Sequence, residues 1–200
     1  ICGGYMMKKI TRPSEDIIVH YSDVHSIQTM SHALTTYIQN ISRPLIVLCI
    51  GTDRSTGDSL GPLTGTLLSQ IPLRHLHVYG TLHAPIHALN LQEQLDTIKR
   101  TYRNPFIIAL DASLGNVKSI GHLIASHHPL RPGAALNKEL PAVGDISLTG
   151  VVNVGGTMGY AVLQSTRLSV VHDMARHLAS TLQRTDRALQ GVKTNEKLSM

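Results

Sequence analysis

Residues 45–62 read LIVLCIGTDRSTGDSLGP, an unbroken apolar run followed by a polar loop that contains glycines. An apolar run of this kind, without alternation, is typical of a strand that is buried on both faces, as in a parallel sheet. A second such run, Phe106–Leu110, is followed at once by Asp111, which we expect to be the last residue of its strand. The two runs therefore predict a parallel sheet with helices on both faces.

The elements around these runs alternate between helix and strand. Apolar residues three and four positions apart predict an amphipathic helix over 24–41, which ends before Pro44. Further helices are expected over 58–70, 87–102 and 158–183, and further strands over 76–79, 120–126 and 146–154. This alternation predicts the α/β class, as a three-layer αβα fold with a mainly parallel sheet of about five strands.

The composition is that of one globular domain. Of the 200 residues, 42% are hydrophobic and 16% are charged, which is typical of a folded chain and not of a disordered one. The domain is expected to span 16–184, between flexible tails over 1–15 and 185–200. Within the first tail, Met6 or Met7 is a candidate natural start.

Charge and cysteine content exclude several classes of protein. The net charge is +5, but the basic residues are scattered and the chain has one phenylalanine and no tryptophan, which argues against nucleic-acid binding. The longest stretch without charge, 146–166, is too polar and too rich in glycine for a membrane helix. Cys2 and Cys49 cannot form a disulfide framework. We therefore expect a cytoplasmic protein without a membrane partner.

Polar side chains follow each predicted strand. In open parallel sheets, ligands bind beyond the carboxyl ends of the strands, so these residues are candidates for a binding site. The candidate substrate-binding residues are Asp53, Arg54, Ser55, Thr56, Thr81, His87 and Asn153, with Lys138 in the long loop over 127–144. Asn153 is expected to face the site and to bind a ligand or a loop, and a simple turn residue is the alternative.

Asp58 and Asp111 are the candidate catalytic residues. If their strands are adjacent, the strand ends lie about 5 Å apart, and two carboxylates that close share a proton or bind a metal. The alternative for each residue alone is structural, because Asp58 could be the N-cap of the next helix and Asp111 could cap a turn. Their joint position at the predicted edge of the sheet favours function.

Other site chemistries are less well supported by the sequence. Neither GxxxxGK[ST] nor GxGxxG follows the first strand, and HExxH does not occur. Cys49 lies inside an apolar run, where it is expected to pack and not to act as a nucleophile. His83 and His87 are four positions apart, but Pro85 between them argues against a regular helix that would bind zinc.

Several motifs in order resemble the YyaC family of sporulation proteins, over about 44–182. These are CIGTDRSTGDSLGP (49–62), YGTLHAPIHALNL (79–91), LDASLG (110–115), LRPGAALNKELPAVGDISLTGVVNVGG (130–156) and LQSTRL (163–168). More remotely, the chain is similar to the germination proteases and the hydrogenase maturation endopeptidases. The resemblance implies a phosphorylase/hydrolase-like fold of the hydrogenase maturation endopeptidase type, in the sporulating cell or spore.

The resemblance also implies an activity. In germination proteases, two aspartates at the places of Asp58 and Asp111 are held to be catalytic, which implies an endopeptidase with a protein or peptide substrate. The alternative is a non-catalytic sporulation protein that binds a peptide or small ligand. In hydrogenase endopeptidases, the corresponding acids and a histidine bind nickel of the substrate, which would add His127 to the pair. We expect no required cofactor, with weakly bound zinc or nickel as the alternative. The sequence leaves undecided whether the chain forms a homo-oligomer.

Overall fold

The computed structural model describes residues 16–132 and 141–189 of the chain. It contains one sheet of six strands in the order β1-β5-β6-β4-β2-β3. The strands are β1 (Ile17–His20), β2 (Leu45–Cys49), β3 (Leu76–Tyr79), β4 (Phe106–Gly115), β5 (His122–Ser126) and β6 (Ile146–Val154). The helices are α1 (Ser26–Ile38), α2 (Leu60–Ser69), α3 (Leu91–Thr101), α4 (Gly159–Gln164) and α5 (Leu168–Ala188), with short 3-10 turns η1 (Gly57–Ser59) and η2 (Val117–Ser119).

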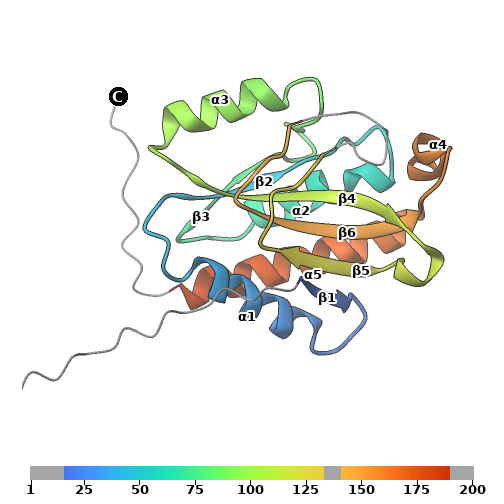
Figure 1. Ribbon diagram of the computed structural model, residues 1–200, viewed down its shortest axis with the longest axis horizontal. Helices are drawn as coiled ribbons and strands as arrows, with labels where there is room; N and C mark the ends of the chain where they lie inside the picture. Colours follow the sequence, from blue (N-terminus) through green and yellow to red (C-terminus); the bar gives the residue numbers. More distant parts are fainter. Residues whose placement is uncertain (1–15, 133–140, 190–200) are drawn as a thin grey trace, which may run out of the picture.

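The helices lie on both faces of the sheet, so the predicted αβα fold is confirmed. In Figure 1, α3 lies on one side of the strands and α1 and α5 on the other. The side chains of β2 alternate between these two faces: Leu45 and Val47 pack with α1, α2 and α5, whereas Ile46 and Leu48 pack with α3. This division explains why the sequence of β2 is apolar at every position.

The direction of the strands differs in part from the sequence expectation. β3, β2, β4 and β6 are parallel, as predicted. β5, however, runs antiparallel to β6, and β1 runs antiparallel to β5. β1 is the sixth strand, and its short IIVH run has no alternation from which a strand could be predicted. An edge strand of this length adds little periodic signal.

Several predicted helix limits also change. The long helix expected over 158–183 is two helices, α4 and α5, which are separated at residues 165–167. The helix expected from His87 begins at Leu91, because the Asn90 side chain accepts the backbone N–H of His87 and donates to the Pro85 carbonyl, which forms a turn. Within the described ranges, no helix has the length and apolar character needed to cross a bilayer.

The C-terminal helix continues beyond the predicted domain limit at residue 184. α5 ends at Ala188, and both Thr185 and Asp186 are buried. The Asp186 carboxylate accepts backbone N–H groups of Arg74, His75 and Leu76 at 2.9, 2.8 and 2.9 Å, where β3 begins. The prediction of a tail from 185 is therefore wrong for its first residues, because their burial depends on β3 and not on local sequence.

Asp186→Ala is expected to destabilise the fold by about 3 kcal/mol, since unpaired buried N–H groups cost about 1 kcal/mol or more each. The measurement is urea unfolding of the purified variant. Asp173→Ala is the matched control on the same helix, since its side chain is 47% exposed. Equal unfolding midpoints for the two variants would contradict this assignment of Asp186.

Candidate active site

The two candidate aspartates lie at the carboxyl edge of the parallel strands. β2 ends at Cys49, which pairs with Leu110 of β4, and the N–H of Ile50 still donates to the Leu110 carbonyl at 2.7 Å. Asp111 follows directly, so it lies just past the end of β2. The expectation that Asp111 ends its own strand is wrong, because pairing with β6 continues β4 to Gly115.

The loop after β2 brings Asp58 back to the same edge. Gly51 has φ of 138°, a conformation that favours glycine, and its N–H donates to the Ile86 carbonyl at 2.8 Å. The N–H of Thr52 then donates to the Asp58 carbonyl at 3.0 Å, which closes the loop. Asp58 lies in η1, whereas the N-cap of α2 is Ser59, so the N-cap alternative for Asp58 is not what the structure shows.

Burial affects the two carboxyl groups unequally. Asp111 is 6% exposed, and its pKa is raised well above the ordinary value by burial and then by the negative charge of Asp58. The N–H of Ala112, which donates to Asp111 at 2.8 Å, opposes this rise. The pKa of Asp58 is also raised by burial, but the charge of His87 and the amide of Thr52 lower it in part. Asp111 is thus the member of the pair that keeps its proton to higher pH.

The raised pKa of Asp111 makes stability depend on pH. A carboxyl group with a raised folded-state pKa stabilises the protein at low pH, and this contribution is lost as pH rises from the unfolded value of about 3.9 through the folded pKa. Asp111→Asn cannot ionise, so its melting temperature is expected to exceed that of the wild type increasingly between pH 5 and pH 8. Thermal unfolding across this range is the measurement. Asp53→Asn, on the exposed loop, is the control, and a constant difference would contradict the expectation.

His87 lies near Asp58 and belongs to the same site. The Asn90 turn holds its backbone in place, and its Nδ1 atom is buried without a hydrogen-bond partner among the described residues. The hydroxyl of Ser55, in the loop that carries Asp58, is likewise buried and unpartnered in the described part of the chain. The structure therefore brings His87 to the aspartates and gives the site polar atoms that no described residue satisfies.

The other predicted substrate-binding residues divide into three groups. Asp53 and Arg54 are exposed on the loop between β2 and η1. Thr56 and Thr81 hold turns of the backbone: the Thr56 carbonyl accepts the Ser59 hydroxyl, and the Thr81 hydroxyl accepts the N–H of Ala84. Lys138 lies outside the described residues.

Asn153 binds a loop, which was one of its two predicted roles. Its side-chain amide donates to the Thr166 hydroxyl at 3.1 Å and approaches the Val162 carbonyl at 3.4 Å. A Cβ on Gly57 would lie 3.0 Å from the same Thr166 hydroxyl, so this connection packs against η1. Asn153 therefore supports the segment that carries Asp58.

His127 is separated from the aspartates, contrary to the sequence expectation. It follows β5, and because β5 is antiparallel, its end lies at the amino edge of the parallel strands. There His127 lines a hollow with Phe106 and Ile146, the first residues of β4 and β6. Among the residues that the structure describes, no three His, Cys, Asp or Glu side chains form a group that could hold a metal. The expected set of Asp58, Asp111 and His127 is thus not assembled.

Two residues that share a sheet face with Asp111 were not predicted from the sequence. Ser113 is two positions further along β4, and Thr149 is the partner of Asp111 on β6. Ala112 and Leu114 pack on the opposite face with α5, which confirms the alternation. Counting by two from Asp111 could have found Ser113, had β4 not been expected to end at Asp111.

Comparisons with known proteins agree with this fold and identify the family. The chain is 48% identical over 170 residues to the uncharacterized protein YyaC of Bacillus subtilis (strain 168), which covers 84% of this chain and 83% of that protein. The crystal structure of the NiFe hydrogenase maturation protease HycI from Thermococcus kodakarensis KOD1 matches 77% of this chain and 98% of that chain, with a TM-score of 0.53. At 14% identity, that match shows a common fold alone. Residues 18–181 match the family model described as Protein of unknown function (DUF1256), and the chain therefore belongs to this family.

Proposed function

We propose that this protein is an endopeptidase that hydrolyses a peptide bond with the Asp58/Asp111 pair. The observation that carries the proposal is the unequal environment of the two carboxyl groups at one edge of the sheet, with Asp111 buried and Asp58 beside His87. Pairs of acids whose environments separate their pKa values are suited to act as base and acid in one reaction. The protease fold of HycI is consistent with the proposal but does not establish the activity.

The environments assign a role to each aspartate. Asp58, whose ionised form is favoured by His87 and Thr52, takes a proton from water. Asp111, which keeps its proton, donates a hydrogen bond to the oxygen of the scissile carbonyl. The water oxygen bonds to the carbonyl carbon, the C–N bond breaks, and the proton held by Asp58 passes to the leaving nitrogen. No metal is needed for these steps.

Sporulation or germination is the proposed setting, and the cytoplasm of the sporulating cell or the spore is the proposed location. This part rests on the resemblance of the motifs from Cys49 to Leu168 to the YyaC family of sporulation proteins. The substrate proposed for testing is accordingly a protein of the spore, with the small acid-soluble proteins as the first candidates.

The experiment is incubation of the purified protein with small acid-soluble spore proteins, followed by mass spectrometry of the products. Cleavage at defined bonds that disappears in the Asp58→Asn/Asp111→Asn double variant is the expected result. Cleavage that survives in the double variant would assign the activity to a contaminant or to another site. Activity that requires added zinc or nickel would contradict the metal-free mechanism. Calorimetric titration of the wild type and of the double variant with these ions would show whether the aspartates bind them.

A second candidate function is binding without catalysis. The buried and unpartnered atoms of His87 and Ser55 favour it, because such atoms are satisfied when a ligand donates or accepts there. Saturable binding of a substrate protein without any product, in the wild type and at every pH tested, would support this alternative.

A further inference from the structure

The face of the sheet that carries Asp111 is covered only in part. α3 packs on β2 and β4 through a cluster that includes Ile46, Leu48 and Ile107, and neither β5 nor β6 contributes a side chain to that cluster. Figure 1 shows the same arrangement, with α3 above β2 and β3 and with β5 and β1 at the opposite end of the sheet. The outer part of this face is therefore open to solvent among the described residues.

A hollow of about 780 Å³ lies on this open face. The residues that line it include Ile18, Ser113, Val117, Lys118, His122 and Ile124. Its volume is within the range of about 300–1,000 Å³ that is typical of ligand sites. The residues come from β4, β6, β5 and β1 and from the connection between β4 and β5. We name it the open-face groove.

The open-face groove lies on the same face of the sheet as Asp111 and begins two residues from it. Asp111 pairs with Thr149, Thr149 with Ile124, and Ile124 with Ile18, so these four side chains form one row across the sheet. Ser113, which lines the groove, is two residues from Asp111 on the same face. Two residues of a strand span about 7 Å, so the groove begins within reach of a peptide bond placed at Asp111.

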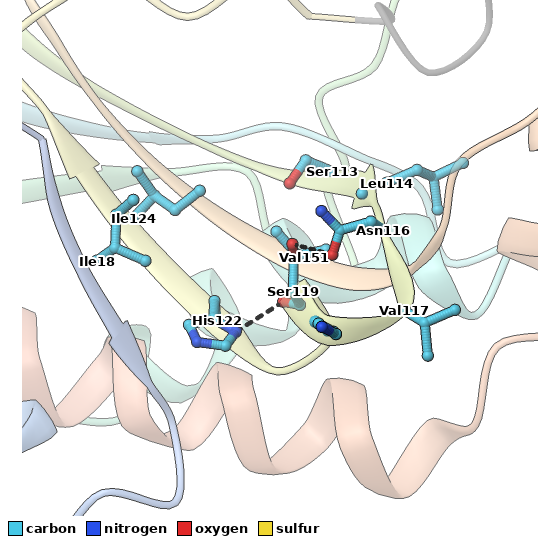
Figure 2. Close-up of a pocket in the computed structure, with 11 residues that line it drawn as sticks. Ile18, Ser113, Leu114, Asn116, Val117, Ser119, His122, Ile124 and Val151 are labelled. Atoms are coloured by element: carbon cyan, nitrogen blue, oxygen red, sulfur yellow. Dashed lines mark hydrogen bonds between the residues drawn. The ribbon is translucent and has the colours of Figure 1, made fainter.

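The floor of the groove is apolar and exposed. Ile18 is 58% exposed, and Val117 at the rim is 74% exposed. Figure 2 shows Ile18 and Ile124 side by side at one end of the groove, on the neighbouring strands β1 and β5. Exposed apolar side chains gathered around one hollow are typical of a binding surface.

The rim carries polar groups and one charge. The Ser119 hydroxyl donates to the side chain of Asn116 at 2.7 Å, and Nδ1 of His122 lies 3.0 Å from the Ser119 carbonyl (Figure 2). The hydroxyl of Ser113 is buried and has no partner among the described residues. Lys118 is charged, and no Asp or Glu is among the lining residues, so the rim is complementary to a negative charge.

We propose that the open-face groove binds an extended segment of the substrate polypeptide in which an apolar side chain lies close to an acidic one. This inference rests on the proposed function, because the segment is taken to continue from the peptide bond at Asp111. From β4 to β1 the groove crosses three strand spacings, about 14 Å, which corresponds to about four residues of extended chain. The apolar side chain packs on Ile18 and Ile124, and the acidic one pairs with Lys118.

The test measures binding separately from hydrolysis. Three fluorescein-labelled peptides of eight residues share an alanine background and carry isoleucine with glutamate, isoleucine with lysine, or serine with glutamate, two positions apart. Fluorescence anisotropy is measured with the Asp58→Asn variant, which cannot cleave them by the proposed mechanism. The isoleucine–glutamate peptide is expected to bind about tenfold more tightly than either of the others. Equal affinities would overturn the proposal.

Two substitutions on the groove locate the binding, each with a matched control elsewhere. Lys118→Glu is expected to weaken binding of the isoleucine–glutamate peptide about tenfold and to strengthen binding of the isoleucine–lysine peptide. Lys99→Glu on α3 is expected to leave both affinities unchanged. Ile18→Asp is expected to weaken binding of both isoleucine peptides. Val24→Asp, at a position that is 87% exposed, is expected to leave their binding unchanged. Affinities that do not differ between groove and control variants would overturn the proposal.

Two further outcomes separate this inference from the proposed function. Binding with the expected preference, without cleavage of any protein by the wild type, would support the groove and reject the peptidase. Cleavage by the wild type that ignores isoleucine and glutamate near the scissile bond would support the peptidase and overturn the groove. A second copy of this chain is the other occupant to test, by sedimentation of the wild type and of the Ile18→Asp variant. A dimer that the substitution dissociates would also overturn the proposal.

Discussion

Asp58→Asn is expected to lower the rate of peptide cleavage by about 10³-fold, within the range of about 10² to 10⁴ that general base catalysis contributes. The variant keeps the size of the side chain but cannot accept the proton of water. Because the pKa of Asp58 is raised, the wild-type rate is expected to rise with pH above the range of an ordinary aspartate. It is then expected to fall as Asp111 loses its proton. Rates measured from pH 4 to pH 9 give both limbs of this profile.

Asp111→Asn distinguishes the two roles. It is also expected to lose activity, because asparagine donates a hydrogen bond but carries no acidic proton. Any activity that remains should lack the alkaline limb, since the amide does not ionise in this range. Asp53→Asn, on the same loop as Asp58 but exposed, is the control and should keep the full profile. An alkaline limb that survives in Asp111→Asn would mean that another group titrates.

Gly65→Ala is expected to destabilise the protein by about 3 kcal/mol or more, the upper part of the cost of overpacking. In an ordinary helix, the same change would stabilise by about 1 kcal/mol. Here a Cβ on Gly65 would overlap the carbonyl oxygen of Gly80 and lie 3.0 Å from its carbonyl carbon. The obstacle is backbone at the end of β3, and it cannot rotate away as a side chain can.

The close approach at Gly65 has a consequence for the site. α2 follows η1 directly, so moving α2 away from β3 would also move Asp58. We therefore expect the loss of stability to be accompanied by a loss of cleavage at temperatures where the variant is still folded. Gly156→Ala is the control, because a Cβ there meets nothing within 4 Å. Urea unfolding of both variants is the measurement, and equal midpoints would contradict the packing argument.

Local sequence alone determined that β2 and the first half of β4 are buried strands and that polar residues follow their apolar runs. The apolar run of β2 could only be buried on both faces, and the polar residues that follow it could only lie at its carboxyl end. For this reason Asp58, Asp111 and His87 were predicted from residue type and spacing. Asn153 was also predicted at this edge, and the structure shows that its side chain donates to Thr166, in the connection that follows α4.

Tertiary contacts decided the remaining features. The direction of β5 depends on its pairing with β6, and this direction moves His127 to the other edge of the sheet. The same pairing surface extends β4 beyond Asp111 and creates the open-face groove. The unequal pKa values of Asp58 and Asp111 arise from burial and from neighbours distant in sequence. Strand direction and burial are properties of the assembled sheet, and therefore no local pattern of residues could determine them.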